Sequence, residues 1–288
     1  MVMRTHERER LEQPDQPSPR SRKGGVRCRP AVVIVSCLAL SLTMLPSAEA
    51  TIVPLDPGAV AAGRPLVWTT QNLPSLASTE PYDAGPGFAA QIENLYRSGR
   101  VRRLQRQIAS AAARAIRQDI GTRCAMSGRG FPGAGGCRDL VVFDIDDTLL
   151  NNFELYAGNH PAFSYDDARQ TRWVEQCRTP ANHPVRRLFR RLQHDGVPVA
   201  LVAGRPGDQR AATRRWLRLR GIDGWRFLIL RDARTADLPA ARFKAMARAH
   251  IQARGYRIVA SIGDQVSDMS HGHLRRGFLL PNPMYYLP

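Results

Sequence analysis

Short apolar runs alternate with longer amphipathic segments along the second half of the chain. The apolar runs lie at 140–144, 197–203, 226–230, 257–262 and 277–280. Patterns of helical period lie between them, at about 184–194, 208–220 and 240–254. Short runs rich in β-branched residues are typical of strands buried on both faces, and their alternation with helices implies right-handed crossovers. The pattern therefore predicts an α/β fold, with a Rossmann-like parallel sheet of about five strands and helices on both faces.

The segment that precedes the first of these strands also has a helical period. Between 88 and 120 the apolar residues are spaced three and four apart, and Ser98-Gly99 interrupts the stripe, so we expect two helices. Residues 51–85 are rich in Pro, Thr, Ser and Gly and lack a period, which indicates an irregular N-terminal arm. The folded domain is therefore expected to span 86–288.

The interval 151–183 does not fit a simple crossover between strands. An insertion directly after the first strand is well placed to form a small cap over a site at the end of that strand. The alternative is a surface excursion whose aromatic side chains pack on the sheet. The aromatic residues of this interval are Phe153, Tyr156, Phe163, Tyr165 and Trp173.

The first fifty residues have the pattern of a leader. A polar, basic stretch precedes an apolar run at 31–45, and Ser47-Ala-Glu-Ala50 fits the small-x-small rule of signal-peptide cleavage. The run is shorter than the ~20 residues that a membrane span needs. We therefore expect a signal peptide at 1–50 and a secreted, periplasmic or cell-surface protein, with no stable membrane span after cleavage. An uncleaved anchor, a lipid on Cys37 and a translation start further along the chain are open alternatives.

Three cysteines follow the leader. Cys124 and Cys137 bracket a glycine-rich loop, and an oxidising compartment would favour a disulfide across it. Closing a loop of about 15 residues is worth roughly 3 kcal/mol in the chain-entropy model. Cys177 would then stay free, and its expected role is that of a small buried apolar residue.

The formal net charge is +17, of which the first fifty residues contribute only three charges. A surface of this kind attracts anions. The arginines alternate with apolar positions on helical stretches, and no zinc-finger spacing, aromatic RNA-binding motif or basic-leucine pattern accompanies them. We therefore do not expect nucleic acid as the main partner, and the sequence leaves the oligomeric state open.

Two carboxylates and a hydroxyl follow the strand at 140–144. The strand ends in Asp144, and Asp146 and Thr148 come at two-residue intervals after it. Open α/β sheets bind their ligands just beyond the carboxyl ends of the strands. There one aspartate can attack phosphorus and its neighbour can shuttle a proton, while a hard cation such as Mg²⁺ offsets their repulsion. By itself the spacing is equally compatible with a solvated, aspartate-rich turn.

Three later segments supply the other groups that phosphoryl transfer requires. Gly204 and Arg205 follow the second strand, where an amide and a guanidinium can receive phosphate oxygens. Lys244 lies at the start of a helix and can hold the phosphate as a compact ammonium. Asp264 and Asp268 follow the fourth strand and are four residues apart in the sequence. One helical turn would put both carboxylates on the same face, where they could act as further ligands of the cation. The structural alternatives are a surface arginine, a surface lysine and a helix-capping aspartate.

These segments, in this order, resemble the motifs of a known family. Asp144-Ile-Asp-Asp-Thr148, Ala203-Gly-Arg205, Lys244 and Gly263-Asp-Gln-Val-Ser-Asp268 are similar to the four motifs of the haloacid-dehalogenase-like hydrolases. Leu280-Pro-Asn-Pro-Met-Tyr-Tyr286 is similar to the C-terminal signature of their secreted acid phosphatase branch, which includes plant vegetative storage proteins and related bacterial enzymes. The resemblance covers the chain from about residue 88 to its end.

The resemblance implies a Mg²⁺-dependent acid phosphatase that acts on small phosphomonoesters. Asp144 would be the nucleophile that forms an aspartyl-phosphate, and Asp146 would protonate the leaving alcohol and then activate water. Asp144, Asp264 and the backbone carbonyl of Asp146 would hold Mg²⁺, with Asp268 as a further ligand or a supporting residue. The residues expected to bind the phosphate are Thr148, Gly204, Arg205 and Lys244.

One position departs from the family pattern. Ala203 stands where the family normally has Thr or Ser, whose hydroxyl donates to a phosphate oxygen. Loss of one such donor typically costs about 3 to 4 kcal/mol of transition-state stabilisation. The alternative function is therefore a phosphate-binding or storage-like protein with weak or no turnover.

Replacement of Ala203 by Thr tests this departure. If the missing hydroxyl limits the reaction, Ala203→Thr raises the rate at which the purified protein hydrolyses p-nitrophenyl phosphate. An unchanged or lower rate would mean that the pocket is built around alanine.

Overall fold

The computed structural model describes residues 51–52, 85–120, 138–159, 162–163 and 166–285 of the 288-residue chain. The expected leader at 1–50 and the expected disulfide between Cys124 and Cys137 lie outside the described residues. Cys177, which is described, is buried and has a free thiol, as expected. Within the described ranges, no helix combines the length and the apolar character that a membrane crossing requires.

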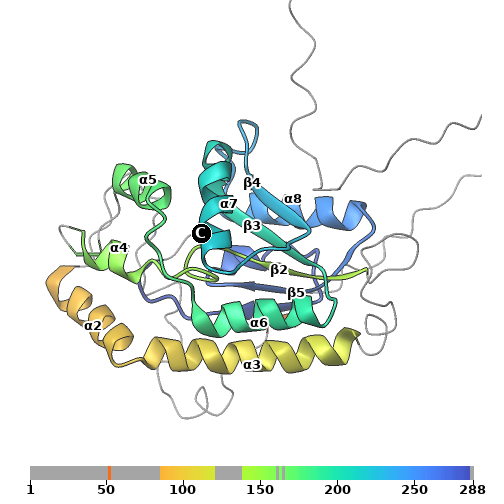
Figure 1. Cartoon of the computed structure of the whole chain (residues 1–288), viewed down its shortest axis with the longest axis horizontal. Helices are drawn as coiled ribbons and strands as arrows, with labels where there is room; N and C mark the ends of the chain where they lie inside the picture. The colour runs from red at the N-terminus through yellow and green to blue at the C-terminus, as the bar shows by residue number, and fades with distance from the viewer. Residues whose placement is uncertain (1–50, 53–84, 121–137, 160–161, 164–165, 286–288) are drawn as a thin grey trace, which may run out of the picture. The chain divides into compact units, whose positions relative to one another are not determined.

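A parallel sheet forms the centre of the domain (Figure 1). Its strands are β1 (Thr51–Ile52), β2 (Asp139–Phe143), β3 (Val199–Pro206), β4 (Phe227–Arg231), β5 (Arg257–Gly263) and β6 (Arg276–Leu279). Their order is β1-β6-β5-β2-β3-β4, and every pairing between neighbours is parallel. The five longer strands confirm the predicted Rossmann-like sheet. The two residues of β1 add an edge strand from the segment that was expected to be irregular.

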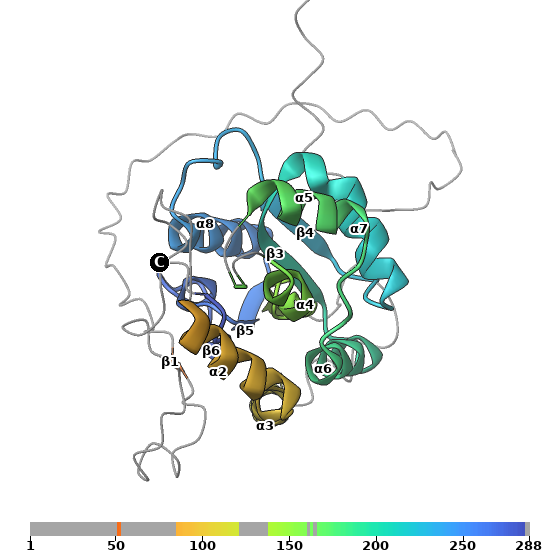
Figure 2. The same ribbon diagram turned by 90° about the vertical axis from the view of Figure 1, so that its left-hand side faces the viewer.

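Helices cover both faces of the sheet (Figures 1 and 2). They are α2 (Gly85–Arg97), α3 (Arg100–Ile120), α4 (Phe153–Ala157), α5 (Asp167–Glu175), α6 (His183–His194), α7 (Arg210–Leu219) and α8 (Ala240–Ala253). Side chains of α3, α6 and α7 share one apolar cluster with the sheet, and those of α8 share another. Alternation along β2 explains the division, because Val141 and Phe143 join the first cluster whereas Leu140 and Val142 join the second.

The helical pattern before β2 is interrupted where the sequence predicts. α2 ends at Arg97 and α3 begins at Arg100. Gly99 between them has a φ of 70°, a left-handed conformation that glycine adopts without steric cost. The buried stripe of α3, which includes Ile108, Ala112 and Ile116, then packs on the sheet.

The order of the strands reverses beside β2. From β2 the chain moves outward through β3 and β4, and it then returns to the other side of β2 for β5 and β6. A reversal of this kind leaves a crevice at the carboxyl ends of the two central strands, where ligands of open α/β sheets bind. Asp144 follows β2 and Asp264 follows β5. The topology therefore places two of the predicted metal ligands on neighbouring strands.

The insertion between β2 and α6 contains α4 and α5. Its two ends meet, because Leu150 and Ala181 form an isolated antiparallel bridge. Its buried aromatic residues belong to a third apolar cluster, separate from the two that cover the sheet. This cluster consists of Ile92, Phe153, Leu155, Tyr156, Phe163, Met284 and Tyr285. The insertion is therefore closed at its base and packed against α2 and the C-terminal segment.

Two leucines of α7 provide a matched test of this packing. Leu217 is fully buried, whereas Leu219 is 61% exposed. Leu217→Ala should lower the free energy of unfolding by about 2–5 kcal/mol, because it leaves a cavity in the core. Leu219→Ala should change it by less than about 0.5 kcal/mol. Urea unfolding of both variants measures the difference, and equal losses would contradict this placement of α7.

Candidate active site

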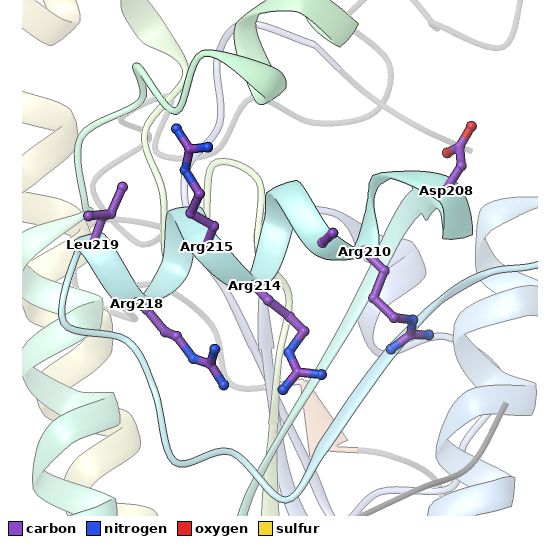
Figure 3. Close-up of a pocket in the computed structure, with 7 residues that line it drawn as sticks. Asp208, Arg210, Arg214, Arg215, Arg218 and Leu219 are labelled. Atoms are coloured by element: carbon purple, nitrogen blue, oxygen red, sulfur yellow. The ribbon is translucent and has the colours of Figure 1, made fainter. Parts of the chain in front are cut away.

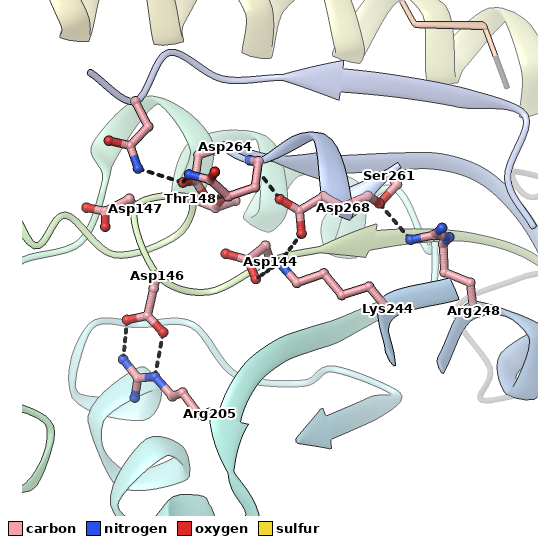
Figure 4. A network of polar contacts seen from close by, with 12 residues as sticks. Asp144, Asp146, Asp147, Thr148, Arg205, Lys244, Arg248, Ser261, Asp264 and Asp268 are labelled. Carbon is pink, nitrogen blue, oxygen red and sulfur yellow. Dashed lines mark hydrogen bonds and ion pairs between the residues drawn. The ribbon is translucent and has the colours of Figure 1, made fainter. Parts of the chain in front are cut away.

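Three buried carboxylates converge at the carboxyl ends of β2 and β5 (Figure 4). Asp144, Asp264 and Asp268 each offer one oxygen, and these oxygens lie within 4.8 Å of one another. The three residues are only 3–6% exposed. Like charges at such separations repel strongly where water is excluded. The ionised cluster therefore requires positive charge beside it.

Lys244 of α8 supplies one positive charge. It is 4% exposed, and its Nζ donates to Oδ1 of Asp144 at 3.0 Å and forms a second ion pair with Asp268. Burial alone would lower the pKa of Lys244, but the charges of Asp144, Asp268 and Asp264 raise it above its ordinary value. Lys244 is therefore a buried ammonium at the cluster and not a surface lysine.

One lysine does not balance three carboxylates. Burial raises the pKa of Asp144 well above its ordinary value although Lys244 opposes the rise, and the charges of Asp268 and Asp264 add to it. Burial and then the charge of Asp268 raise the pKa of Asp264 to about 6. A divalent cation would stabilise the ionised forms of both groups. Because the donors are carboxylate oxygens, the set fits a hard cation such as Mg²⁺.

Three side chains donate hydrogen bonds to the Asp264 carboxylate and orient it. The Thr148 hydroxyl donates to its Oδ1 at 3.0 Å. The side-chain amides of Gln265 and Asn282 donate to its Oδ2 at 2.6 and 2.8 Å. Thr148 was expected to bind phosphate, and in the structure its hydroxyl donates to the Asp264 carboxylate. Asn282 belongs to the C-terminal signature, but the sequence assigned it no role.

Asp268 is held against the end of β5. Its Oδ2 accepts the backbone amide of Gln265 at 3.0 Å, and its own amide donates to the Gln265 carbonyl at 3.0 Å. The segment Val266–Asp268 is a 3₁₀ helix, whereas the spacing in the sequence allowed for a helical turn that would put Asp264 and Asp268 on one face. A Cβ atom at Gly263 would overlap with the Asp268 side chain. A glycine at 263 therefore makes this close approach possible.

Arg248 of α8 fixes the loop that follows Asp268. It is 1% exposed, and its guanidinium donates to the carbonyls of Asp268 at 2.8 Å and Gly272 at 2.9 Å and also to that of Ser270. The Ser261 hydroxyl donates to the Asp268 carbonyl at 2.7 Å. Burial lowers the pKa of Arg248 to about 10, so it is still charged at neutral pH. Sequence reasoning missed this residue because it lies among many other arginines.

Asp146 pairs with Arg205 and is not one of the three clustered carboxylates (Figure 4). Nε and Nη2 of Arg205 donate to the two carboxylate oxygens, each at 2.7 Å. Nη1 donates to Thr213 at 3.1 Å, and the guanidinium carbon lies 4.8 Å from the Trp216 ring centroid. Burial would raise the pKa of Asp146, but the charge and hydrogen bonds of Arg205 lower it overall. Arg205 was expected to receive phosphate, and all three of its nitrogens are engaged within the protein.

Both ends of the insertion connect to Asp146. The Asn152 side-chain amide donates to Oδ1 of Asp146 at 3.0 Å. The Thr179 hydroxyl donates to Oδ1 of Asn152 at 2.7 Å, and Trp173 Nε1 donates to that hydroxyl at 2.6 Å. Asn152 precedes α4 and Thr179 follows α5. The insertion is therefore joined to the predicted proton-transfer residue through a chain of polar contacts.

Asp147 links the turn after β2 to the C-terminal segment. The Tyr285 hydroxyl donates to its Oδ2 at 2.7 Å, and the backbone N–H of Asn152 donates to its Oδ1 at 2.8 Å. Asp147 has a φ of 55°, a left-handed conformation that Asp tolerates better than most residues. Burial and then the charge of Asp264 raise the pKa of Asp147 to about 8. Sequence reasoning missed Asp147 because its partners are distant in the chain or lie in the insertion.

The end of β3 contributes Ala203 and Gly204. Ala203 is fully buried and belongs to the apolar cluster on the face of α3, α6 and α7. Gly204 is exposed, and a Cβ atom placed on it would have only Arg231 Nε nearby, at 3.9 Å. In the described part of the chain, Arg231 is therefore the one side chain near the Gly204 Cβ position, beside the amide that was expected to receive a phosphate oxygen.

Comparison with known proteins identifies the family. The model of the HAD superfamily, subfamily IIIB (Acid phosphatase) matches residues 91–288. The chain belongs to this family. The match includes every residue predicted to form the site, from Asp144 to Asp268, and it extends through the C-terminal segment that carries Asn282 and Tyr285.

Individual relatives agree with this assignment. Acid phosphatase 1 of Solanum lycopersicum is 35% identical over 152 residues, which cover 52% of this chain and 60% of the relative. Vegetative storage protein 1 of Arabidopsis thaliana is 30% identical over 149 residues, which cover 51% of this chain and 55% of the relative. The chain thus spans less than two thirds of the curated relatives that it matches.

A solved structure shares the fold. The class C acid phosphatase from Bacillus anthracis superposes with a TM-score of 0.53 at 17% identity, over 69% of this chain and 85% of that chain. At this level of identity the likeness concerns the arrangement of strands and helices.

Two glycines at strand ends test the geometry of the site. Gly263→Ala should destabilise the protein by about 1–3 kcal/mol, because the added methyl group displaces the buried Asp268. Gly204→Ala should be nearly neutral, since its Cβ would meet only Arg231 Nε, at an ordinary van der Waals distance of 3.9 Å. Thermal unfolding of both variants measures the contrast. If Gly263→Ala is as stable as Gly204→Ala, Asp268 does not lie against the end of β5.

Proposed function

We propose that this chain is an exported, Mg²⁺-dependent acid phosphatase that hydrolyses small phosphomonoesters through an aspartyl-phosphate on Asp144. The observation that carries the proposal is the convergence of Asp144, Asp264 and Asp268 within 4.8 Å beside the Lys244 ammonium. Membership of the acid phosphatase family and the likeness to acid phosphatase 1 of tomato support it. Export rests on the leader pattern at 1–50.

In the first step an oxygen of Asp144 attacks phosphorus, and the bond between phosphorus and the alcohol oxygen breaks. The Lys244 ammonium holds Oδ1 of Asp144, so the attacking group is oriented before the ester binds. Mg²⁺, held by Asp144, Asp264 and the carbonyl of Asp146 with Asp268 in support, would neutralise charge on the phosphate. Asp146 donates the proton that the leaving alcohol takes up.

In the second step water attacks the phosphorus of the aspartyl-phosphate, and Asp146 accepts the proton. The pair with Arg205 favours the ionised carboxylate, which is the form that this second step needs. The first step needs the protonated form, whose fraction grows as the pH falls. This requirement is consistent with an enzyme that works best in acid.

We further propose that the insertion at 151–183 caps the site and selects the ester. Asn152 and Thr179 connect the two ends of the insertion to Asp146, and α4 packs against the C-terminal segment that carries Tyr285. A substrate that displaces one of these contacts would therefore affect the proton-transfer residue directly.

A phosphate-binding or storage-like protein with little turnover is the second candidate. Ala203 favours it, because no hydroxyl is present at the end of β3 where the family normally provides one. The likeness to a vegetative storage protein of Arabidopsis thaliana is in keeping with it. The retained Asp144 and Asp146 favour the enzyme.

Hydrolysis of p-nitrophenyl phosphate separates the two candidates. The purified protein should release nitrophenol in acidic buffer with Mg²⁺, and removal of the cation with a chelator should abolish the release until Mg²⁺ is restored. No turnover between acid and neutral pH in the presence of Mg²⁺ would refute the enzyme. Phosphate binding without turnover would favour the storage-like protein.

The nucleophile is tested by Asp144→Asn. The amide has nearly the same shape as the carboxyl group but cannot attack phosphorus, so the rate should fall at least about a thousandfold. Asp208→Asn, a change of the same kind on the surface, should leave the rate unchanged. If Asp144→Asn keeps its rate, another group is the nucleophile.

A further inference from the structure

The positive charge of the chain is concentrated on one side of the sheet. The helices α3, α6 and α7 carry fourteen arginines between them, with Asp119 as their only acidic residue. Asp119 is buried and pairs with Arg275 and Arg276. The arginine surface of these helices is therefore not neutralised by carboxylates of the same helices.

Two hollows open in this arginine-rich surface. One lies along α7 and is lined by Asp208, Arg210, Ala211, Arg214, Arg215, Arg218 and Leu219 (Figure 3). It is wide, with a volume of about 770 Å³, and Arg210 is already bonded to the Leu228 carbonyl at 2.8 Å. The other is a small pocket between α3 and α6, which lie side by side in both views of the fold (Figures 1 and 2).

The pocket between α3 and α6 has a volume of about 160 Å³. Its charged lining consists of Arg102 and Arg106 from α3 with Arg187 and Arg191 from α6. Small residues of α3, including Ala109 and Ser110, leave room between the two helices. Guanidinium groups from two rigid helices therefore border one compartment.

The arginines of this pocket are largely uncompensated. Among the described residues, Arg102, Arg106 and Arg187 have no acidic partner, and Arg191 meets Asp195 only at 3.6 Å on the exposed side of α6. His183 at the start of α6 lies close enough to these arginines for their charges to affect its pKa. Partial burial and then the charges of Arg186, Arg102 and Arg187 lower its pKa. Positive charges at such density favour a bound anion.

We propose that the pocket between α3 and α6 is a second anion site, which binds a phosphate group of a ligand outside the catalytic centre. Guanidinium groups match phosphate because their parallel N–H groups bond two oxygens at once. Arginines of both helices can donate hydrogen bonds to a tetrahedral anion from two sides. The phosphate can belong to a free phosphate compound or to a lipid headgroup, and the chemistry of recognition is the same. The site does not depend on Asp144 or on catalysis.

The test compares two double variants of the full chain that lose the same charge from the same helices. Arg102→Gln/Arg187→Gln removes one pocket arginine from each helix. Arg114→Gln/Arg190→Gln removes an exposed arginine from each helix outside the pocket. Calorimetry with inorganic pyrophosphate, in the presence of a chelator, measures free phosphate binding. Sedimentation with phosphatidylcholine vesicles, with and without phosphatidylglycerol, measures lipid binding.

The pocket variant should bind at least about tenfold more weakly than the unmodified protein in one of the two assays, because it loses charged hydrogen bonds to the anion. The control variant should stay within about twofold, since general attraction changes equally in both variants. The assay that shows the loss identifies the source of the phosphate. Equal binding by the two variants in both assays, or no binding by the unmodified protein, would overturn the proposal. Thermal unfolding checks that both variants are folded. Because both assays measure binding and not turnover, their outcome does not depend on whether the protein is a phosphatase.

Discussion

Electrostatic repulsion among buried carboxylates is the constraint on which this structure depends. Asp144, Asp264 and Asp268 are almost fully buried, and within the described ranges the one ammonium beside them is that of Lys244. Removing charges from water is costly, and attraction repays the cost only where geometry and hydrogen bonding are good. The fold meets this demand by placing Asp144 and Asp264 at the ends of neighbouring strands and by holding Asp268 against the end of β5.

The surrounding residues oppose the remaining repulsion in two ways. Hydrogen bonds from Thr148 and Asn282 orient Asp264, and Arg248 fixes the loop after Asp268. Asp146 is kept apart from the cluster by its bidentate pair with Arg205. The Arg205 guanidinium in turn stacks over the Trp216 ring. The carboxylates therefore occupy two environments, one that could hold a cation and one paired with a guanidinium.

Much of this arrangement follows from local patterns in the sequence. The apolar runs predicted the five longer strands, and the carboxylates at the ends of those runs predicted that Asp144 and Asp264 meet. The partners of Arg205 and Thr148 were not predictable in this way, because a phosphate and a carboxylate present the same acceptor oxygens to a donor. Asn152, Asn282 and Tyr285 were missed because their contacts depend on how the insertion and the C-terminal segment pack. Those segments have no period that specifies a register.

Calorimetric titration of the purified chain with Mg²⁺ tests most directly whether the carboxylate cluster is built for a cation. The account predicts that one Mg²⁺ binds per chain, that Asp264→Asn abolishes this binding, and that the surface change Asp208→Asn leaves it intact. Absence of Mg²⁺ binding, or equal binding by the Asp264→Asn protein, would contradict the account.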